Sequence, residues 1–226
     1  MTGKINAKEL KEPDKLQTAF LDFMRLISEN RQKVYLISAV LFIFLFVAGG
    51  YYLYRLDYEK KSDILFTKVF DAKMKGATPN DKDVNPIDAY AQVISKYPKS
   101  RAALLAQYRM GNIYFEQGET DKAIQAYGAF LSRSKDDNDI KTLTHTGLGY
   151  CYEIKKDYQS ALTSFQKALA TKEGVIFAGM TYRNIARIYE QMNDHIKAVE
   201  YYKKALTETK DPPAELLIKR KISQLS

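Results

Sequence analysis

The sequence contains no tryptophan, one cysteine and two histidines among its 226 residues. One cysteine excludes a disulfide within the chain, and Cys151 lies between Tyr150 and Tyr152 in a helical pattern, which predicts a buried thiol. His145 and His195 lack the spacing of metal ligands. We expect His145 to pack and His195 to lie at a solvated helix start. Glycine-rich phosphate loops, GxSxG motifs and metal-ligand spacings are all missing. The sequence therefore predicts no enzyme activity, cofactor, metal site or small-molecule substrate.

Concentrated charge is also missing. The 35 Lys and Arg residues against 27 Asp and Glu residues give a net charge of +8. Residues 1–33 carry 7 basic and 5 acidic side chains, and residues 55–226 carry 28 and 22. Because tracking of a phosphate backbone needs Lys and Arg clustered on one face, this distribution argues against nucleic acid as a partner.

One segment has no charge at all. Residues 34–54 form an uncharged run of 21 residues between Lys33 and Arg55, with tyrosines near both ends. A helix of this length reaches roughly 30 Å, the thickness of the hydrocarbon core of a bilayer. A buried core helix of this kind is rare in a small domain, and a cleaved signal peptide has a shorter apolar run nearer the N-terminus. The sequence therefore predicts a single transmembrane helix over residues 34–55. The basic residues on its two sides balance, so charge leaves the orientation open.

Residues 1–33 are expected to form a polar tail, over residues 1–12, followed by an amphipathic juxtamembrane helix. The apolar residues of that helix recur at helical spacing on one face: Leu16, Phe20, Phe23, Met24 and Ile27. Such a helix suits the membrane surface or a partner's cytoplasmic face. A plain amphipathic extension of the span is the alternative.

Beyond the span the chain repeats itself with a period of 38 and then 37 residues. Four columns align without gaps: Gly111, Gly149 and Ala186; Tyr114, Tyr152 and Tyr189; Ala123, Ala161 and Ala198; and Tyr127, Phe165 and Tyr202. A partial earlier copy is visible at Pro86, Tyr90 and Val93. Four units are therefore expected.

These columns resemble the tetratricopeptide repeat over about residues 57–210, in which each unit is a hairpin of a helix A and a helix B. The period exceeds the usual value, which predicts a helix A lengthened by about a turn. Polar A-to-B turns are expected at residues 119–121, 156–157 and 193–194. The predicted loop between Lys75 and Pro86 lies inside the first hairpin.

The predicted fold class is all-α: a single transmembrane helix, then a tetratricopeptide-like α-solenoid of about four helical hairpins with a C-terminal capping helix. The repeat domain spans residues 56–211 and the capping helix residues 212–226. In that helix Leu217, Ile218, Ile222 and Leu225 are expected on one face, closing the open end of the solenoid.

The resemblance places helix A residues along an inner groove. The candidate residues are Tyr108, Arg109, Asn112 and Glu116; Thr146, Tyr150 and Glu153; and Arg183, Asn184, Arg187 and Glu190. Aromatic rings with Arg and Asn suit an extended peptide, which needs stacking surface and hydrogen-bond partners. The alternative is that these are ordinary solvated helix residues. Gly147 stands where the two-carboxylate clamp of chaperone-binding repeat domains needs Asn.

The order of a polar lead, an ENRQK junction at residues 29–33, one span and repeats resembles the bacterial family of ancillary SecYEG translocon subunits. That resemblance implies an inner-membrane protein with a cytoplasmic N-terminus and periplasmic repeats, acting in protein export. Its partners would be extended or folded polypeptides, translocon subunits or a membrane-anchored chaperone. The first hypothesis is therefore a membrane-anchored adaptor for extended polypeptide. The second is a structural subunit of a secretion, motility or division apparatus.

Overall fold

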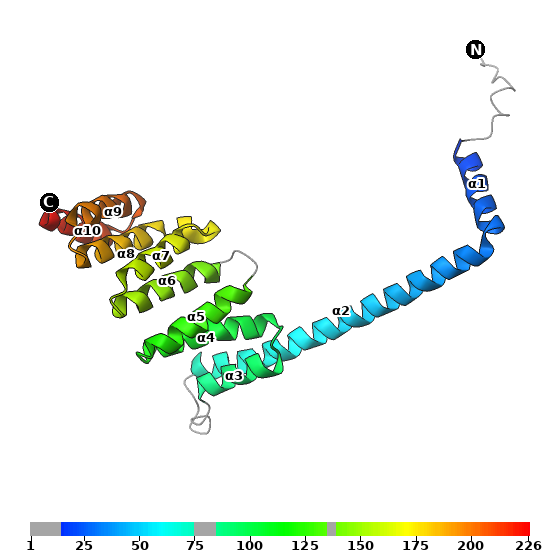
Figure 1. Cartoon of the computed structure of the whole chain (residues 1–226), viewed down its shortest axis with the longest axis horizontal. Coiled ribbons are helices and arrows are strands. Elements are labelled where there is room, and N and C mark those ends of the chain that lie inside the picture. Colours follow the sequence, from blue (N-terminus) through cyan, green and yellow to red (C-terminus); the bar gives the residue numbers. More distant parts are fainter. Residues whose placement is uncertain (1–14, 75–84, 135–138) are drawn as a thin grey trace, which may run out of the picture. The chain divides into compact units, whose positions relative to one another are not determined.

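The computed structural model describes residues 15–74, 85–134 and 139–226, and the ordered elements in these ranges are helices (Figure 1). The chain divides into two compact units, Met1–Asp57 and Tyr58–Ser226, which are described separately. The predicted all-α class is confirmed within these ranges.

The first unit contains α1 (Lys15–Glu29) and the beginning of α2 (Arg31–Met74). Only Asn30 separates the two helices, and its side-chain amide donates to the backbone oxygen of Leu26 at 3.2 Å. On α1 the side chains of Phe20, Phe23 and Met24 are exposed, and that of Ile27 is half-buried.

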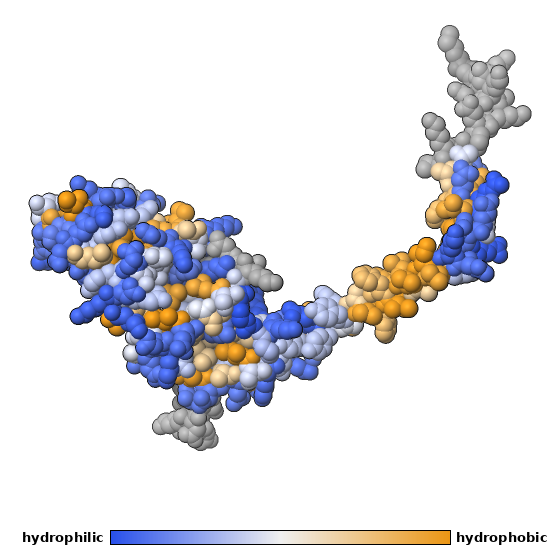
Figure 2. All heavy atoms as spheres, in the orientation of Figure 1, coloured by the Kyte–Doolittle hydropathy of each residue, from blue (hydrophilic) through white to orange (hydrophobic). Residues whose placement is uncertain are grey.

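Within Arg31–Val69, α2 is long and apolar enough to cross a membrane, and its most apolar window contains no buried residue. Figure 2 shows this window as a hydrophobic band on α2 with hydrophilic residues at both ends. The segment predicted to span, residues 34–55, lies inside α2.

The same helix supplies the first helix A of the second unit, which the sequence analysis did not foresee. No Gly or Pro occurs between Tyr51 and Met74, so nothing in this stretch ends the helix. Val69 packs with Tyr90 and Val93 of α3 (Pro86–Lys96), the matching helix B. Most of the predicted loop between Lys75 and Pro86 falls outside the described residues.

Two polar side chains of α2 accept hydrogen bonds from backbone N–H groups in the segment that follows α3. The Tyr58 hydroxyl accepts from the backbone N–H of Lys99 at 3.2 Å, and the Glu59 carboxylate accepts from that of Arg101 at 3.0 Å. These bonds satisfy donors in the connection to the next hairpin.

Three further hairpins follow α3. They are α4 (Arg101–Glu116) with α5 (Thr120–Arg133), α6 (Asp139–Ile154) with α7 (Tyr158–Leu169), and α8 (Ala178–Gln191) with α9 (His195–Glu208). Each helix A packs on its own helix B, and successive hairpins stack (Figure 1). The predicted solenoid of hairpins is confirmed.

The aligned small residues set the distance between the helices of a hairpin. A Cβ atom on Gly111 would lie 2.5 Å from the ring of Tyr127, and one on Gly149 would lie 2.5 Å from the ring of Phe165. Atoms do not approach this closely without displacement, so glycine lets each aromatic ring of helix B lie against the backbone of helix A.

The A-to-B turns recur with the same backbone form. Gly118, Lys156 and Asn193 all have a positive φ, of 77°, 59° and 59°. Asp157 and Asp194 follow the last two and cap α7 and α9 by accepting a backbone N–H at 3.1 Å. The first turn was predicted two residues too late, because α5 already begins at Thr120.

The repeat period of 37–38 residues was expected to lengthen every helix A. In the last repeat the additional residues lie instead in the connection before helix A. α4 and α6 each have 16 residues, but α8 has 14. Between α7 and α8 the chain forms a 3-10 helix, η1 (Lys172–Val175), which the sequence analysis missed.

The capping helix α10 (Pro212–Leu225) begins after Asp211, whose carboxylate accepts from the backbone N–H of Ala214 at 3.1 Å. Ile218 is buried against the last hairpin, and Ile222 and Leu225 pack beside it. Leu217 was expected on the same face but is 52% exposed. Neighbouring residues of a helix point about 100° apart, so Leu217 points away from the face that Ile218 buries. The packed face of α10 is therefore narrower than predicted.

Candidate functional site

The first helices of three successive hairpins, α4, α6 and α8, lie along one side of the solenoid. We call the following residues of these helices, two of which (Thr146 and Asn184) are buried beneath the others, the helix A surface: Tyr108, Arg109, Asn112, Phe115, Glu116, Leu143, Thr146, Tyr150, Glu153, Ile154, Arg183, Asn184, Arg187, Glu190 and Gln191. Side chains of neighbouring hairpins touch across it. The rings of Phe115 and Tyr150 have centroids 6.4 Å apart, which joins α4 to α6.

Glu153 is the centre of a polar network between α6 and α8. Arg187 donates from Nε and Nη2 to its two carboxylate oxygens at 2.8 and 2.7 Å, and Gln191 donates to one of them at 2.7 Å. Burial lowers the pKa of Arg187, but the hydrogen bonds and charge of Glu153 outweigh it and raise that pKa. The arginine is therefore a permanent cation in a fixed orientation.

Tyr150 lies beside this network. Its hydroxyl accepts from the side-chain amide of Asn184 at 2.9 Å, and the Arg187 guanidinium carbon lies 5.7 Å from its ring centroid. Asn184 is only 1% exposed, so it orients Tyr150 from below the surface. Sequence reasoning had placed Asn184 among groove residues, and the structure gives it this positioning contact.

The α4 part of the surface combines a tyrosine ring with an arginine and an asparagine. Tyr108 is half-buried, with its ring centroid 6.2 Å from that of Tyr127. Asn112 accepts from the Tyr127 hydroxyl at 2.8 Å, and Arg109 is exposed with its guanidinium 5.9 Å from the Tyr108 ring. Aromatic faces and polar groups are thus both accessible here.

Several members of the predicted groove differ in accessibility. Thr146 is buried and donates to the backbone oxygen of Thr142 at 2.9 Å. Arg183 is half-buried on α8. Glu190 accepts from Tyr202 at 2.9 Å and from Lys221 of α10 at 2.6 Å, so it ties the capping helix to the last hairpin.

Sequence reasoning missed four members of the surface: Phe115, Leu143, Ile154 and Gln191. Leu143 and Ile154 are exposed, at 36% and 58%, and they supply the apolar contact area that the predicted set lacked. The repeat alignment could have identified Leu143. It lies six residues before Gly149, and the equivalent positions of the neighbouring units are also apolar, Leu105 and Met180.

The cysteine and the two histidines all lie on helices of the repeat array. Cys151 is fully buried, and burial raises the pKa of its thiol to about 11. His145 is half-buried within α6, and His195 is exposed at the first residue of α9. Among the residues that the structure describes, no group of three or more His, Cys, Asp and Glu side chains could hold a metal ion.

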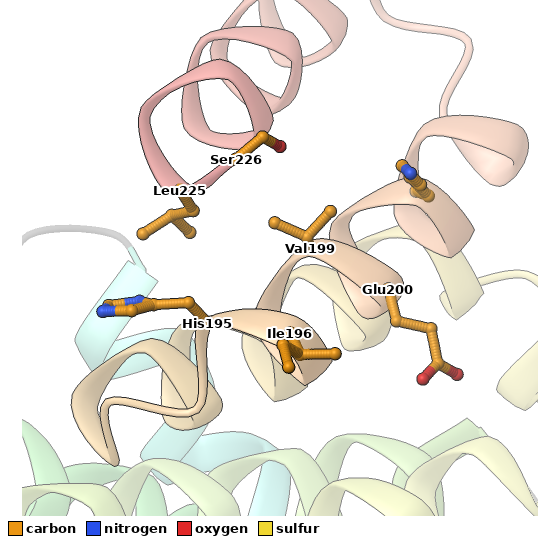
Figure 3. Close-up of a pocket in the computed structure, with 7 residues that line it drawn as sticks. His195, Ile196, Val199, Glu200, Leu225 and Ser226 are labelled. Atoms are coloured by element: carbon orange, nitrogen blue, oxygen red, sulfur yellow. The ribbon is translucent and has the colours of Figure 1, made fainter.

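A separate hollow of about 450 Å³ lies away from the helix A surface, between α9 and the end of α10 (Figure 3). It is lined by His195, Ile196, Val199, Glu200, Lys203, Leu225 and Ser226. We call it the α9–α10 hollow. Three of the seven lining side chains are apolar, those of Ile196, Val199 and Leu225, and the other four are polar or charged.

Comparison with known proteins supports the repeat architecture. A family model described as tetratricopeptide repeat matches residues 101–174 and 142–207. These matches cover α4 to α9 almost completely, including every hairpin that contributes to the helix A surface.

Parts of the chain are also similar to individual proteins. The photosystem I assembly protein Ycf3 of Prochlorococcus marinus is 33% identical over 66 residues, which cover 29% of this chain and 38% of that protein. The chain thus spans little more than a third of the length of this relative. Among solved structures, MamA has a TM-score of 0.55 at 21% identity, covering 69% of this chain and 80% of the other. BtubC from P. vanneervenii has a TM-score of 0.59 at 14% identity, covering 77% and 75%. At these identities the structures share the fold alone.

Proposed function

We propose that the chain is a membrane-anchored adaptor that binds extended polypeptide on its helix A surface. Residues 101–207 match the tetratricopeptide repeat model, and repeats of this kind serve as scaffolds for protein–protein interaction. One observation carries the proposal. Aromatic, apolar and hydrogen-bonding side chains occur together over three hairpins, and the Glu153–Arg187 network orients those of α6 and α8. An extended segment needs stacking area and backbone partners along its length, and this surface offers both.

The anchor in this proposal is the uncharged stretch of α2 between Lys33 and Arg55. Its length, its apolar composition and the exposure of its side chains support a membrane span. We place it in the bacterial inner membrane with the N-terminus cytoplasmic and the repeats periplasmic, in line with the resemblance to translocon-associated proteins. Anchoring in the membrane raises the effective concentration of the helix A surface near a membrane complex, so that weak binding is sufficient.

The partners in this proposal are newly exported chains beside the protein translocon, with a translocon subunit or a membrane-anchored chaperone as a folded neighbour. The order of polar lead, span and repeats supports this choice. Exported chains emerge extended, which is the form that a row of helix A side chains accommodates.

Site-specific photo-crosslinking in cells tests the binding surface. A photoreactive residue at Arg109 or Ile154, both exposed on the helix A surface, should capture many different exported chains. The matched control is Thr163, which is exposed on α7 outside this surface and should capture few. Equal capture from Thr163, or none from either test position, would contradict the proposal.

A second candidate function is a structural subunit of an envelope assembly that docks folded partners. Val175 and Ile176 favour it, because they are 74% and 78% exposed in the connection after α7, outside the helix A surface. Capture of one stoichiometric folded partner from these positions, without exported chains from Arg109, would favour this candidate.

Cysteine labelling tests the orientation. The native Cys151 is fully buried, so an engineered cysteine at the exposed Thr163 provides the accessible thiol of the folded repeats. A membrane-impermeant reagent should label Thr163→Cys in intact spheroplasts and should label Gln17→Cys, near the N-terminus, only after lysis. The reverse pattern would place the repeats in the cytoplasm.

A further inference from the structure

The helix α1 is separate from the apolar stretch of α2 that follows it. Asn30 lies between them: its backbone N–H donates to the oxygen of Leu26 at 3.2 Å, and its backbone oxygen accepts from the N–H of Val34 at 3.0 Å. The Asn30 side-chain amide also donates to the Leu26 oxygen at 3.2 Å, which satisfies a carbonyl in the last turn of α1. α1 is therefore a helix of its own rather than an unbroken continuation of α2.

The apolar residues of α1 gather on one face, which we call the α1 apolar face. At about 100° per residue, four of them fall within about 100° of the helix circumference: Phe20, Phe23, Met24 and Ile27. Leu26 lies beside this arc and Leu21 outside it. Figure 2 shows hydrophobic residues on one side of α1 and hydrophilic residues on the other. No side chain between residues 17 and 30 is buried, so within the described residues the face is open.

The charged residues of α1 cancel one another. Lys15 and Arg25 balance Asp22 and Glu29, and Arg25 pairs with Glu29 at 3.1 Å. An amphipathic helix binds a surface through its apolar area and through attraction between opposite charges. Because the second contribution is small for α1, its apolar face has to supply the binding.

The place of α1 in the chain puts its apolar face at the level of a membrane surface. Glu29, the last residue of α1, precedes Val34, the first residue of the uncharged run, by five positions, which is about 7 Å of helix. Headgroups occupy about 5–8 Å on each side of the hydrocarbon core of a bilayer. Arg31 and Lys33 lie between the two, where cationic side chains reach lipid phosphates.

We propose that α1 is an interfacial helix, which lies in the membrane surface on the N-terminal side of α2 with the α1 apolar face among the acyl chains. This inference rests on the proposed span of α2. A lipid surface is the occupant of the face because the face adjoins the exposed apolar stretch of α2 and because a bilayer needs no complementary charge, which α1 lacks. The helix therefore binds zwitterionic and anionic lipids alike.

Depth-dependent fluorescence quenching tests this placement on the full-length chain in phosphatidylcholine nanodiscs. An environment-sensitive fluorophore is attached to Phe20→Cys or to Thr18→Cys, which lies about 160° away around the helix. Cys151 is buried, so the engineered thiol takes the label. Lipid brominated near the headgroup end of its acyl chains should quench the label at Phe20→Cys, and iodide in the water should quench the label at Thr18→Cys. The same pattern is expected when phosphatidylglycerol is added.

A label in α2 separates this inference from the proposed span. A fluorophore at Phe44→Cys, inside the uncharged run, should be quenched by lipid brominated near the middle of the bilayer. Absence of that quenching would contradict the span and the interfacial helix together. Quenching at Phe44→Cys with a water-exposed label at Phe20→Cys would overturn the interfacial helix alone. Both outcomes are independent of polypeptide capture at the helix A surface.

A charge on the α1 apolar face should release the helix from the lipid. Phe23→Asp, added to the chain labelled at Phe20→Cys, should abolish quenching by brominated lipid and expose the label to iodide. Thr18→Asp places the same charge on the opposite side of α1 and should leave the quenching unchanged. Retained lipid quenching in the Phe23→Asp chain would contradict insertion of this face.

Three further results would overturn the proposal. They are equal quenching by brominated lipid at Phe20→Cys and Thr18→Cys, quenching at Phe20→Cys only when phosphatidylglycerol is present, and protection of that label from iodide only after a cytoplasmic extract is added. The last result would make a protein, rather than lipid, the occupant of the face.

Discussion

At the scale of single residues, Gly111 and Gly149 determine how closely the helices of two hairpins approach. A methyl group at either position would overlap the ring of Tyr127 or Phe165. We expect Gly111→Ala and Gly149→Ala each to lower the free energy of unfolding by about 1–3 kcal/mol, measured by urea denaturation. Gly128 in α5 has no neighbouring atom within 4 Å, so Gly128→Ala should instead raise stability by up to about 1 kcal/mol. Equal effects at the three positions would contradict this account.

Glu153 accepts the charged hydrogen bonds that join α6 to α8. Glu153→Ala removes the acceptor of both Arg187 and Gln191 and should lower the free energy of unfolding by about 1–3 kcal/mol. A double-mutant cycle with Arg187→Met measures the pair itself, and we expect a coupling energy of about 0.5 kcal/mol or more. Additive effects would show that the network does not join the hairpins.

At the scale of elements, the turn between helices A and B has a left-handed residue in each of three units. Lysine is strained in this backbone form, whereas asparagine tolerates it. Lys156→Gly should raise the free energy of unfolding by about 0.5–1 kcal/mol, since the relief of strain exceeds the entropic cost of glycine. Asn193→Gly should give a smaller gain in the same urea titration. A loss of stability in Lys156→Gly would argue against the turn geometry.

The docking of α10 depends on pH through Glu190. Burial raises the pKa of this carboxyl, but hydrogen bonds from Lys221 and Tyr202 outweigh burial and hold the pKa below its ordinary value of 4.5. A lowered folded-state pKa stabilises the fold above the unfolded value, and the stabilisation is lost as the pH falls through the folded value.

The difference in melting temperature between the native chain and Glu190→Gln should therefore be largest at neutral pH and shrink below pH 4.5. Glu200→Gln is the matched control, because Glu200 pairs with Lys204 on the exposed surface of one helix. A pH-independent difference for Glu190→Gln would contradict the assigned role.

The elements of the repeat region could largely be predicted, because aligned small and aromatic residues report directly on helix packing. The extent of α2 was missed, since a span was expected to end where its hydrophobic run ends, although no helix-breaking residue follows Tyr54 until after Met74. The burial of Asn184 and the exposure of Leu217 were also missed. The exposure of each of these side chains depends on which side of its helix packs against the neighbouring helix. A shift of one residue along a helix rotates the side chain by about 100°, which the sequence pattern does not resolve.

At the scale of the whole molecule, the chain combines an apolar helix with a repeat array that has two separate surfaces. The helix A surface extends over three hairpins, whereas the α9–α10 hollow is local to the last one. In the proposed adaptor the apolar helix raises the local concentration of the helix A surface at a membrane, so a weak contact along several hairpins is enough to hold an extended chain there.

Equilibrium binding of an unfolded polypeptide tests the central claim most directly. The full-length chain in lipid nanodiscs is titrated into a labelled protein that is kept unfolded by reduction, and separately into the oxidised, folded form of the same protein. We expect saturable binding of the unfolded form only, weakened about tenfold or more when Tyr108, Ile154 and Arg183 are replaced together by serine. The same number of serine substitutions at exposed residues of the helices B should have no effect. Equal binding of the folded and unfolded forms, or unchanged binding by the triple variant, would contradict the account.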